Sequence, residues 1–130
     1  MPSPRYWREV PARFRLAATR CKACKTVSYP GRRVCPSCRA DDLESIALSR
    51  EAKVVTSTVI HVGPTDLTME APYAMAIVET PEKARLTVQV TDCDLDAVKP
   101  GMDVRLEFRR IRKEGHSGIL CYGYKAVPAN

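Results

Sequence analysis

Four of the six cysteines in this 130-residue chain form two CxxC pairs, Cys21-x2-Cys24 and Cys35-x2-Cys38, with ten residues between them. Each CxxC turn directs two thiolates at one point, and the intervening hairpin brings the two turns together. Tetrahedral zinc coordination needs this arrangement, with Zn–S distances of about 2.3 Å. Four sulfur ligands leave no position open for an activated water, so the spacing predicts a structural Zn²⁺ rather than a catalytic one. A module of this size buries too little apolar surface to fold alone, so the metal would supply the missing stability.

The same cysteines leave three alternatives to zinc. Iron in a rubredoxin-like site uses an identical ligand set, which the spacing does not separate from zinc. A redox dithiol is disfavoured, because a catalytic CxxC begins a helix in a thioredoxin-like βαβ pattern that this sequence lacks. A disulfide staple is disfavoured too, since the N-terminus has no apolar core of a secretory signal and thiols stay reduced inside cells. We therefore expect a cytoplasmic protein, and no apolar run approaches the roughly 20 residues that cross a membrane.

Positive charge is concentrated at the N-terminal end. Residues 1–40 contain ten Lys or Arg and one acid, Glu9, whereas residues 41–130 contain eleven Lys or Arg and fourteen acids. Thiolate ligation of zinc would offset about two of these positive charges, because metal binding deprotonates cysteine. The remaining basic segment suits an anionic partner such as nucleic acid, a phosphate-bearing cofactor or an acidic protein surface.

The segment before the first cysteine, residues 1–20, has helical periodicity. Tyr6, Val10 and Phe14 recur at every fourth position, which predicts a short amphipathic helix. Pro11 is expected to break a single long helix and to begin a second short one. The apolar stripe also carries the only tryptophan, Trp7. Large aromatic side chains dominate protein interfaces, so Tyr6, Trp7 and Phe14 are the predicted contacts to a protein partner.

Residues 44–130 form a block of predicted strands. Five β-branched or alternating stretches are separated by turns, and five strands in about 80 residues suit a small Greek-key barrel of the OB type. The fold class is therefore mainly β: an N-terminal helical segment (1–20), a rubredoxin-like zinc ribbon (21–43) and a five-stranded OB-fold barrel (44–130). The predicted strands lie at 52–62, 73–80, 85–91, 103–112 and 118–127.

Two loops carry residues suited to recognition. Between the CxxC pairs, KTVSYPGRRV presents Tyr29, Arg32 and Arg33 at the hairpin tip. This tip is either a solvated turn or an anion site, since paired arginines can hold phosphate oxygens in bidentate fashion. The loop at 64–76 is rich in Leu, Met and Pro, and it is either buried at a barrel end or part of a protein interface.

No catalytic motif accompanies these features. The sequence contains no Walker loop, no GxGxxG, no GxSxG and no HExxH. No acid–base pair or activated nucleophile stands out either. We predict no catalytic residue and a protein that is not itself an enzyme.

Several stretches together resemble a known family. They are similar to the zinc-ribbon/OB-fold proteins of the domain-of-unknown-function 35 type, and the resemblance covers nearly the whole chain. The N-terminal part looks most like the small subunit of the archaeal acetoacetyl-CoA thiolase/3-hydroxy-3-methylglutaryl-CoA (HMG-CoA) synthase complex. The stretches that carry the resemblance are PRYWREVPARFRLAATRCKAC, the pair CKAC and CPSC, PYAMAIVE and VKPGMDVRLEF.

The resemblance implies a scaffold protein. In that family the ribbon and its N-terminal helix bridge a thiolase and a synthase that share a CoA-binding region. An intermediate of the mevalonate pathway thereby passes between the two sites without release. The four paired cysteines match the family's metal ligands, and the resemblance implies a CoA-facing role for Arg32 and Arg33. Tyr29, at the same hairpin tip, completes the predicted CoA-binding set. Two positions depart from the family pattern: Lys25 replaces a usual Gly, and Gly31 replaces the second Pro of Pro-Pro-Arg.

A single-stranded nucleic-acid binder is the alternative, because zinc ribbons and OB barrels both bind single strands. Such binding uses aromatic side chains on a strand face together with a basic groove. Here the strand block is net acidic, although two of its few aromatics share a strand face. A thioesterase or lyase activity lacks a candidate base. We therefore expect an acyl-CoA enzyme and CoA as partners, and neither nucleic acid nor a membrane. The aromatics of the strand block are Tyr73, Phe108, Tyr122 and Tyr124.

Overall fold

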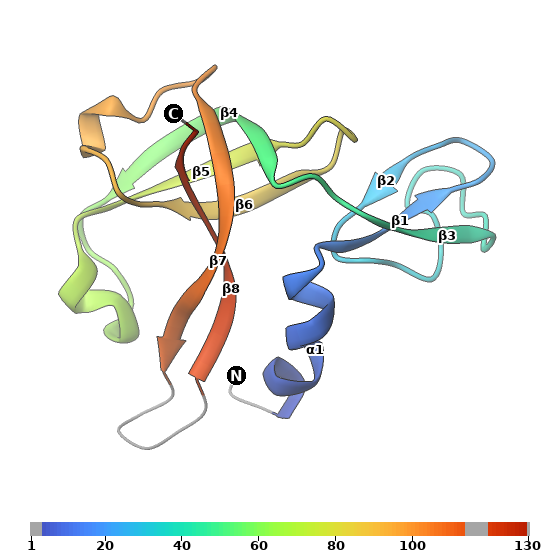
Figure 1. Ribbon diagram of the computed structural model, residues 1–130, viewed down its shortest axis with the longest axis horizontal. Coiled ribbons are helices and arrows are strands. Elements are labelled where there is room, and N and C mark those ends of the chain that lie inside the picture. The colour runs from blue at the N-terminus through green and yellow to red at the C-terminus, as the bar shows by residue number, and fades with distance from the viewer. Residues whose placement is uncertain (1–3, 114–119, 130) are drawn as a thin grey trace.

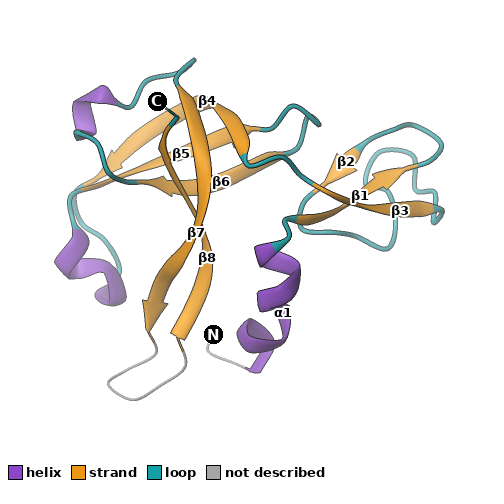
Figure 2. Cartoon of the chain, viewed as in Figure 1, coloured by secondary structure: helices purple, strands orange, loops and turns teal. Residues whose placement is uncertain are grey.

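A helix, a three-stranded sheet and a closed five-stranded barrel follow one another along the chain (Figure 1). The computed structural model describes residues 4–113 and 120–129, and the side chains of residues 4–7, 66–68 and 112–113 lie outside that description. Strands account for most of the regular structure (Figure 2). The predicted fold class is confirmed: mainly β, with a short N-terminal helix, a ribbon and an OB-type barrel.

Helix α1 spans Pro4–Phe14 without interruption. The expectation that Pro11 separates two helices is wrong, since Pro11 lies inside α1. Proline removes one N–H donor, but its φ suits a helix, and only the last turn of α1 follows it. The N–H of Arg15 still bonds the carbonyl of Pro11 at 3.1 Å. Leu16, buried and at φ +51°, then ends the helix.

The ribbon sheet consists of β1 (Ala17–Cys21), β2 (Val27–Ser28) and β3 (Leu43–Ala47). The strands are antiparallel in the order β2-β1-β3, with Ala17 opposite Ala47 and Cys21 opposite Leu43. The sheet thus begins before and ends after the predicted ribbon, residues 21–43. Because β1 and β3 are paired along their whole length, the chain leaves the ribbon beside the point where it entered.

The barrel strands match the five predicted stretches to within a few residues, and they close in the order β4-β5-β6-β8-β7. Every pair is antiparallel except β6 and β8, which meet in parallel at Val90 and Ala126. Two short 3-10 helices, η1 (Thr65–Glu70) and η2 (Leu95–Ala97), lie in the connections. The strands are β4 (Glu51–Ile60), β5 (Tyr73–Glu79), β6 (Arg85–Val90), β7 (Asp103–Lys113) and β8 (Leu120–Pro128).

Alternation of side chains along the strands fills the barrel. On β6, Leu86, Val88 and Val90 are buried while the residues between them point outward, as the sequence alternation predicts. Val78, Val104 and Leu106 are fully buried on neighbouring strands. Leu16 and Ala18, from the start of the ribbon, belong to the same buried cluster as the barrel residues. One core is therefore shared between the ribbon's first strand and the barrel.

The ribbon and α1 are bound to the barrel by a cluster around Arg50. The guanidinium of Arg50 lies 5.3 Å from the ring centroid of Phe14 and 5.9 Å from that of Tyr124. The Phe14 ring also meets Phe108 edge-on, with centroids 5.4 Å apart. The Tyr124 hydroxyl donates a hydrogen bond to the carbonyl of Phe14. Figure 1 shows α1 beside the β7–β8 hairpin, where these contacts hold it.

Replacement of Tyr124 by Phe tests this junction. The substitution removes the hydroxyl and leaves the Phe14 carbonyl without its donor, so we expect a loss of about 1 kcal/mol of unfolding free energy. Hydrogen exchange in α1 should rise more than in β5 or β6, because the lost bond holds only the helix. Urea denaturation and amide exchange measure the two effects, with Tyr122→Phe as the matched control. Equal exchange changes in α1 and in the barrel would contradict the assignment.

Candidate metal centre and ribbon tip

The two CxxC pairs form two matching turns. The N–H of Lys25 bonds the Cys21 carbonyl and the N–H of Arg39 bonds the Cys35 carbonyl, both at 3.0 Å. The N–H of each first cysteine in turn bonds a carbonyl five residues later, at 2.9 Å for Cys21 and 2.8 Å for Cys35. Lys25 and Arg39 both adopt positive φ, +64° and +63°. Each turn therefore reverses the chain tightly enough to place both of its sulfurs on one side.

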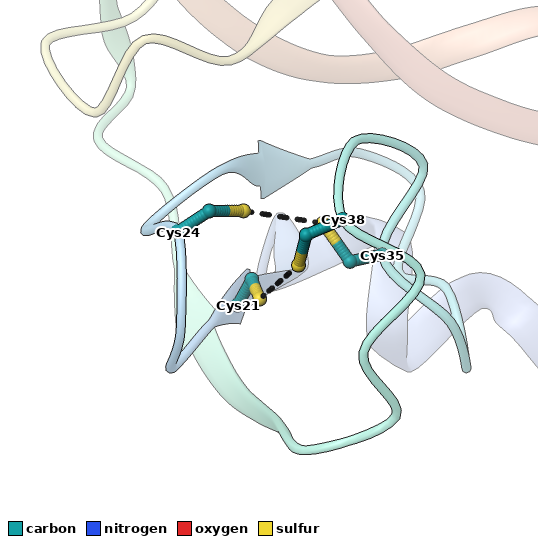
Figure 3. Close-up of side chains that lie close together, drawn as sticks. All are labelled: Cys21, Cys24, Cys35 and Cys38. Carbon is teal, nitrogen blue, oxygen red and sulfur yellow. Dashed lines mark hydrogen bonds between the residues drawn. The ribbon is translucent and has the colours of Figure 1, made fainter.

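The four Sγ atoms converge, as Figure 3 shows. All four lie within 4.8 Å of one another, with Cys21–Cys38 at 3.5 Å and Cys24–Cys35 at 3.4 Å. A tetrahedron with Zn–S bonds of about 2.3 Å has sulfur–sulfur edges of about 3.8 Å. The sulfur–sulfur distances here, from 3.4 Å up to at most 4.8 Å, lie on both sides of that edge length. Cys21 and Cys35 are buried, whereas Cys24 and Cys38 are exposed. The residues fit a structural Zn²⁺ whose ligand positions are all filled by the chain.

Local hydrogen bonds prepare two of the sulfurs for ligation. The hydroxyl and backbone of Thr26 lower the pKa of Cys24 to about 6. Backbone hydrogen bonds, first from Cys38 and then from Ser37, lower the pKa of Cys35. The backbone hydrogen bond from Ala40 lowers the pKa of Cys38. The neighbouring sulfurs of Cys21 and Cys24 raise it by more, so the pKa of Cys38 is raised to about 12 overall. Four ionised sulfurs at this spacing therefore need a cation among them.

Lys25 occupies a backbone conformation that favours glycine, which explains why the resembling family usually has Gly there. A side chain at φ +64° costs about 1 kcal/mol relative to glycine. We expect Lys25→Gly to raise the zinc affinity about fivefold, because metal binding and ribbon folding are coupled. Competition with a chromophoric chelator measures this change. Lys22→Gly, at a position with ordinary φ, should lower the affinity instead, and a rise there would contradict the backbone explanation.

The ribbon tip separates Tyr29 from the arginines. Arg32 and Arg33 are exposed, and neither forms an ion pair with another described residue. The N–H of Arg32 bonds the Thr19 hydroxyl at 3.1 Å, and a Cβ on Gly31 would come within 3.0 Å of the Thr19 methyl. Thr19 thus fixes the backbone beneath the arginines.

Tyr29 packs against the buried core instead of extending outward. Burial raises the pKa of its hydroxyl. Tyr29 is therefore placed to support the ribbon tip from the side of the barrel, which the sequence did not indicate. The peptide bonds before Pro30 and Pro72 are cis.

Ion pairs neutralise part of the basic N-terminal segment. Arg20 pairs with Glu44 at 2.6 Å and Lys22 with Asp42 at 3.3 Å, both across the ribbon. The Arg20 guanidinium also lowers the pKa of the Glu44 carboxyl. Among the ribbon's cations, the two exposed arginines of the tip are not neutralised by ion pairs of this kind.

The predicted aromatic contacts lie in α1. The side chains of Tyr6 and Trp7 fall outside the described residues. Phe14 is 50% exposed, and its other half contacts Phe108 and Arg50. Its ring therefore already stabilises the junction between α1 and the barrel, and only one side remains available to a partner.

Aromatic side chains of the barrel serve packing under α1. Phe108 stacks on Tyr122 with centroids 5.6 Å apart, and Tyr124 is buried. The exposed or half-buried outward residues of β5 and β6, the strand pair on which OB folds commonly bind oligonucleotides, include no aromatic side chain in the described structure, because Tyr73, on the same side of β5, is buried. They are Met75, Ile77, Glu79, Arg85, Thr87 and Gln89. This arrangement gives single-stranded nucleic acid no stacking surface on that face.

Sequence reasoning missed Thr19, Thr26 and Arg50. Thr26 lies two residues after Cys24, and its hydroxyl contacts that sulfur at 3.1 Å. A threonine so close to a metal-ligating cysteine is a local signal that could have identified it. Thr19 and Arg50 act through contacts distant in sequence, for which a single sequence carries no signal.

The four-sulfur ribbon joined to a closed barrel defines a two-module zinc-ribbon/OB-fold protein. The family model of the ChsH2 rubredoxin-like zinc ribbon domain matches residues 8–44, and that of the ChsH2 C-terminal OB-fold domain matches residues 45–109. The chain belongs to the DUF35 family of zinc-ribbon/OB-fold proteins. None of the helices in the described structure is long and apolar enough to span a membrane.

Relatives share nearly the full length of the chain. A DUF35 domain-containing scaffold protein of Methanocaldococcus jannaschii is 46% identical over 125 residues, which cover 95% of this chain and 89% of the relative. Benzoylsuccinyl-CoA thiolase subunit BbsA of Thauera aromatica is 32% identical over 110 residues, covering 85% and 74%. A solved structure of an Ltp2-ChsH2(DUF35) aldolase matches with a TM-score of 0.74 at 28% identity, covering 98% and 94%.

Proposed function

We propose that this chain is a non-catalytic scaffold subunit of an acyl-CoA enzyme complex, and that it bridges an acetoacetyl-CoA thiolase and an HMG-CoA synthase. The observation that carries the proposal is a four-cysteine metal site with no open ligand position, in a ribbon whose tip exposes two arginines, one of them with its backbone held by Thr19. A metal held by four protein sulfurs supplies stability and no activated water. The names of the relatives, a scaffold protein and a thiolase subunit, support the same class.

The arginine pair suits the phosphate groups of CoA. Guanidinium groups bind phosphate through paired, charge-assisted hydrogen bonds, and these gain strength when the backbone is held in place beforehand. Thr19 and Gly31 hold the backbone of Arg32 here. We assign Arg32 and Arg33 to contact CoA and Tyr29 to support them from the core side. A shared CoA region of this kind would let the thioester intermediate of the mevalonate pathway pass between the two enzymes.

The shared core supports a bridging role in physical terms. A scaffold holds two bound enzymes in a fixed relative position only if its own binding surfaces do not move relative to each other. Leu16 and Ala18 enter the barrel core, and the N–H of Ser49 bonds the Glu82 carboxylate at 2.7 Å across the junction. Two enzymes bound to the ribbon and to the barrel would therefore be held at one distance.

Co-purification tests the proposal. The tagged full chain is co-expressed with the thiolase and synthase of its own organism, and mass photometry and metal analysis are applied to the eluate. We expect an assembly of three proteins with about one zinc per copy of this chain. Recovery of nucleic acid in place of the enzymes, with binding that falls steeply as salt rises, would contradict the scaffold function and support single-stranded nucleic-acid binding instead.

A further inference from the structure

Strand β3 is an open edge of the ribbon sheet. The barrel closes on itself, whereas the ribbon sheet ends on one side at β2 and on the other at β3 (Figure 1). The β2 edge is only two residues long and is followed by Tyr29 and Pro30, of which the proline carries no N–H. The β3 edge runs over five residues, from Leu43 to Ala47, and its pairing with β1 has no bulge. A regular edge of this kind is a template for a further strand.

Hydrogen bonds at the two ends of β3 show which of its backbone groups face outward. At one end, the N–H of Lys22 bonds the Asp42 carbonyl at 3.2 Å. At the other end, the N–H of Leu48 bonds the Leu16 carbonyl at 3.0 Å. Only every second pair of opposed residues in antiparallel strands exchanges hydrogen bonds. The even-numbered residues of β3 therefore bond β1, and the N–H and C=O groups of its odd-numbered residues point away from the sheet.

The odd-numbered residues of this edge are Leu43, Ser45 and Ala47. Their outward N–H and C=O groups bond no other residue in the described parts of the chain. Ser45 and Ala47 are exposed and Leu43 is half-buried, so the edge is accessible. The strand contains neither Lys nor Pro, the residues that commonly protect such edges, and its one charged residue, Glu44, pairs with Arg20.

A second copy of β3 is complementary to this edge. Antiparallel pairing about a two-fold axis at Ser45 places Leu43 opposite Ala47 of the second copy, and Ser45 opposite Ser45. Each of these opposed pairs then exchanges both of its hydrogen bonds. On the other face of the sheet, Glu44 lies opposite Ile46 of the second copy. The pairing therefore uses every outward group of the edge and places no like charges opposite each other.

Charge and hydrogen bonding disfavour the neighbouring registers. An axis at Glu44 would place the two Glu44 carboxylates directly opposite each other, which is unfavourable, and would leave Ala47 unpaired. An axis at Ile46 would leave Leu43 unpaired. The register centred on Ser45 is therefore the favoured one.

Opposite charges come together at both ends of the paired strands. In the favoured register Asp42 faces Leu48 of the second copy, and Arg50 of that copy follows two residues later. Long side chains reach such diagonal neighbours. The Asp42 carboxylate is 72% exposed, and Arg50 is exposed and forms no ion pair with another described residue. The two-fold axis repeats this contact, so charge complementarity favours a second copy as the occupant of the edge.

We propose that the chain forms a symmetric homodimer by antiparallel pairing of two β3 strands centred on Ser45. The two ribbon sheets then form one continuous sheet in the order β2-β1-β3-β3-β1-β2. The pairing does not use the arginine tip. It therefore goes beyond the proposed scaffold function and holds whichever enzymes the chain binds.

Charge substitutions at Ser45 test the dimer. Sedimentation equilibrium of the zinc-loaded full chain is measured from micromolar to millimolar concentration, and a dimer has twice the chain mass of 14.5 kDa. S45K and S45D each place like charges opposite each other, so we expect each to weaken dimerisation at least about tenfold. An equimolar mixture of the two variants should restore the dimer, because opposite charges then face each other. T87K, at an exposed strand position on the barrel, is the matched control and should dimerise like wild type.

Two outcomes of this experiment contradict the proposal. One is a wild-type chain that stays monomeric at millimolar concentration. The other is a dimer whose affinity changes less than about twofold in both S45K and S45D, since like charges on the axis must weaken the proposed pairing.

Amide exchange in wild type shows which surface pairs, and it does not depend on the folding of any variant. The N–H groups of Leu43, Ser45 and Ala47 should exchange rapidly in dilute protein and at least about tenfold more slowly where the dimer forms. Those of Glu44 and Ile46 should be protected at both concentrations, because they bond β1. Hydrogen-exchange mass spectrometry with residue-level fragmentation measures both sets. A dimer without protection at the three outward groups overturns the proposal, and so does protection that appears only when another protein is added.

Discussion

Cys35→Ser is expected to abolish stoichiometric zinc binding and to unfold the ribbon while the barrel remains structured. Cys35 is buried, and its sulfur lies 3.4 Å from that of Cys24, so serine removes one corner of the tetrahedron. Zinc contributes on the order of 10 kcal/mol to the folding of such modules, far more than this small sheet gains from packing. Loss of one thiolate therefore removes the main source of its stability.

Metal analysis and amide exchange measure the two parts of this expectation. Zinc per chain should fall from about one to near zero, and exchange should rise in β1–β3 but not in β5 or β6. Cys93→Ser is the matched control, because Cys93 is a partly exposed thiol outside the cluster. Retention of one equivalent of metal with unchanged melting would show that the ribbon does not depend on four-sulfur ligation.

The charge reversal R32E/R33E is expected to weaken CoA binding by the assembled complex about 100-fold. Each arginine would lose its charge-assisted bonds to phosphate and would present a repelling carboxylate instead. Both side chains are exposed and form no ion pair with a described residue, so the fold should be unaffected. The prediction thus isolates ligand binding from stability.

Calorimetric titration of CoA into the assembled complex measures the effect. K83E/K99E changes the net charge by the same amount at exposed positions on the barrel and should leave the affinity within about twofold. Titration with dephospho-CoA distinguishes a contact to the ribose phosphate from one to the pyrophosphate. Equal losses in both double variants would mean that the overall charge, and not the ribbon tip, attracts CoA.

Short sequence patterns predicted the zinc ribbon and the barrel strands well, because metal-ligand spacing and strand alternation depend only on residues close together in the chain. The CxxC spacing and the alternation of Leu86, Val88 and Val90 express geometry that repeats over a few residues, and the structure has both where they were expected. Pro11 shows the limit of such patterns. A proline near the end of a helix costs little when the following turn is closed by other bonds, and those bonds depend on how Leu16 enters the core.

The sequence by itself determined the four metal ligands, the five barrel strands and the basic character of the ribbon, because spacing, alternation and charge act over short stretches of chain. Only the tertiary structure decided that Tyr29 faces the core, that Arg50 joins α1 to the barrel, and that Thr19 holds the backbone of Arg32. Each of these depends on which residues distant in sequence meet in space. The closure of the barrel and the sharing of one core set those meetings, and no short pattern encodes them.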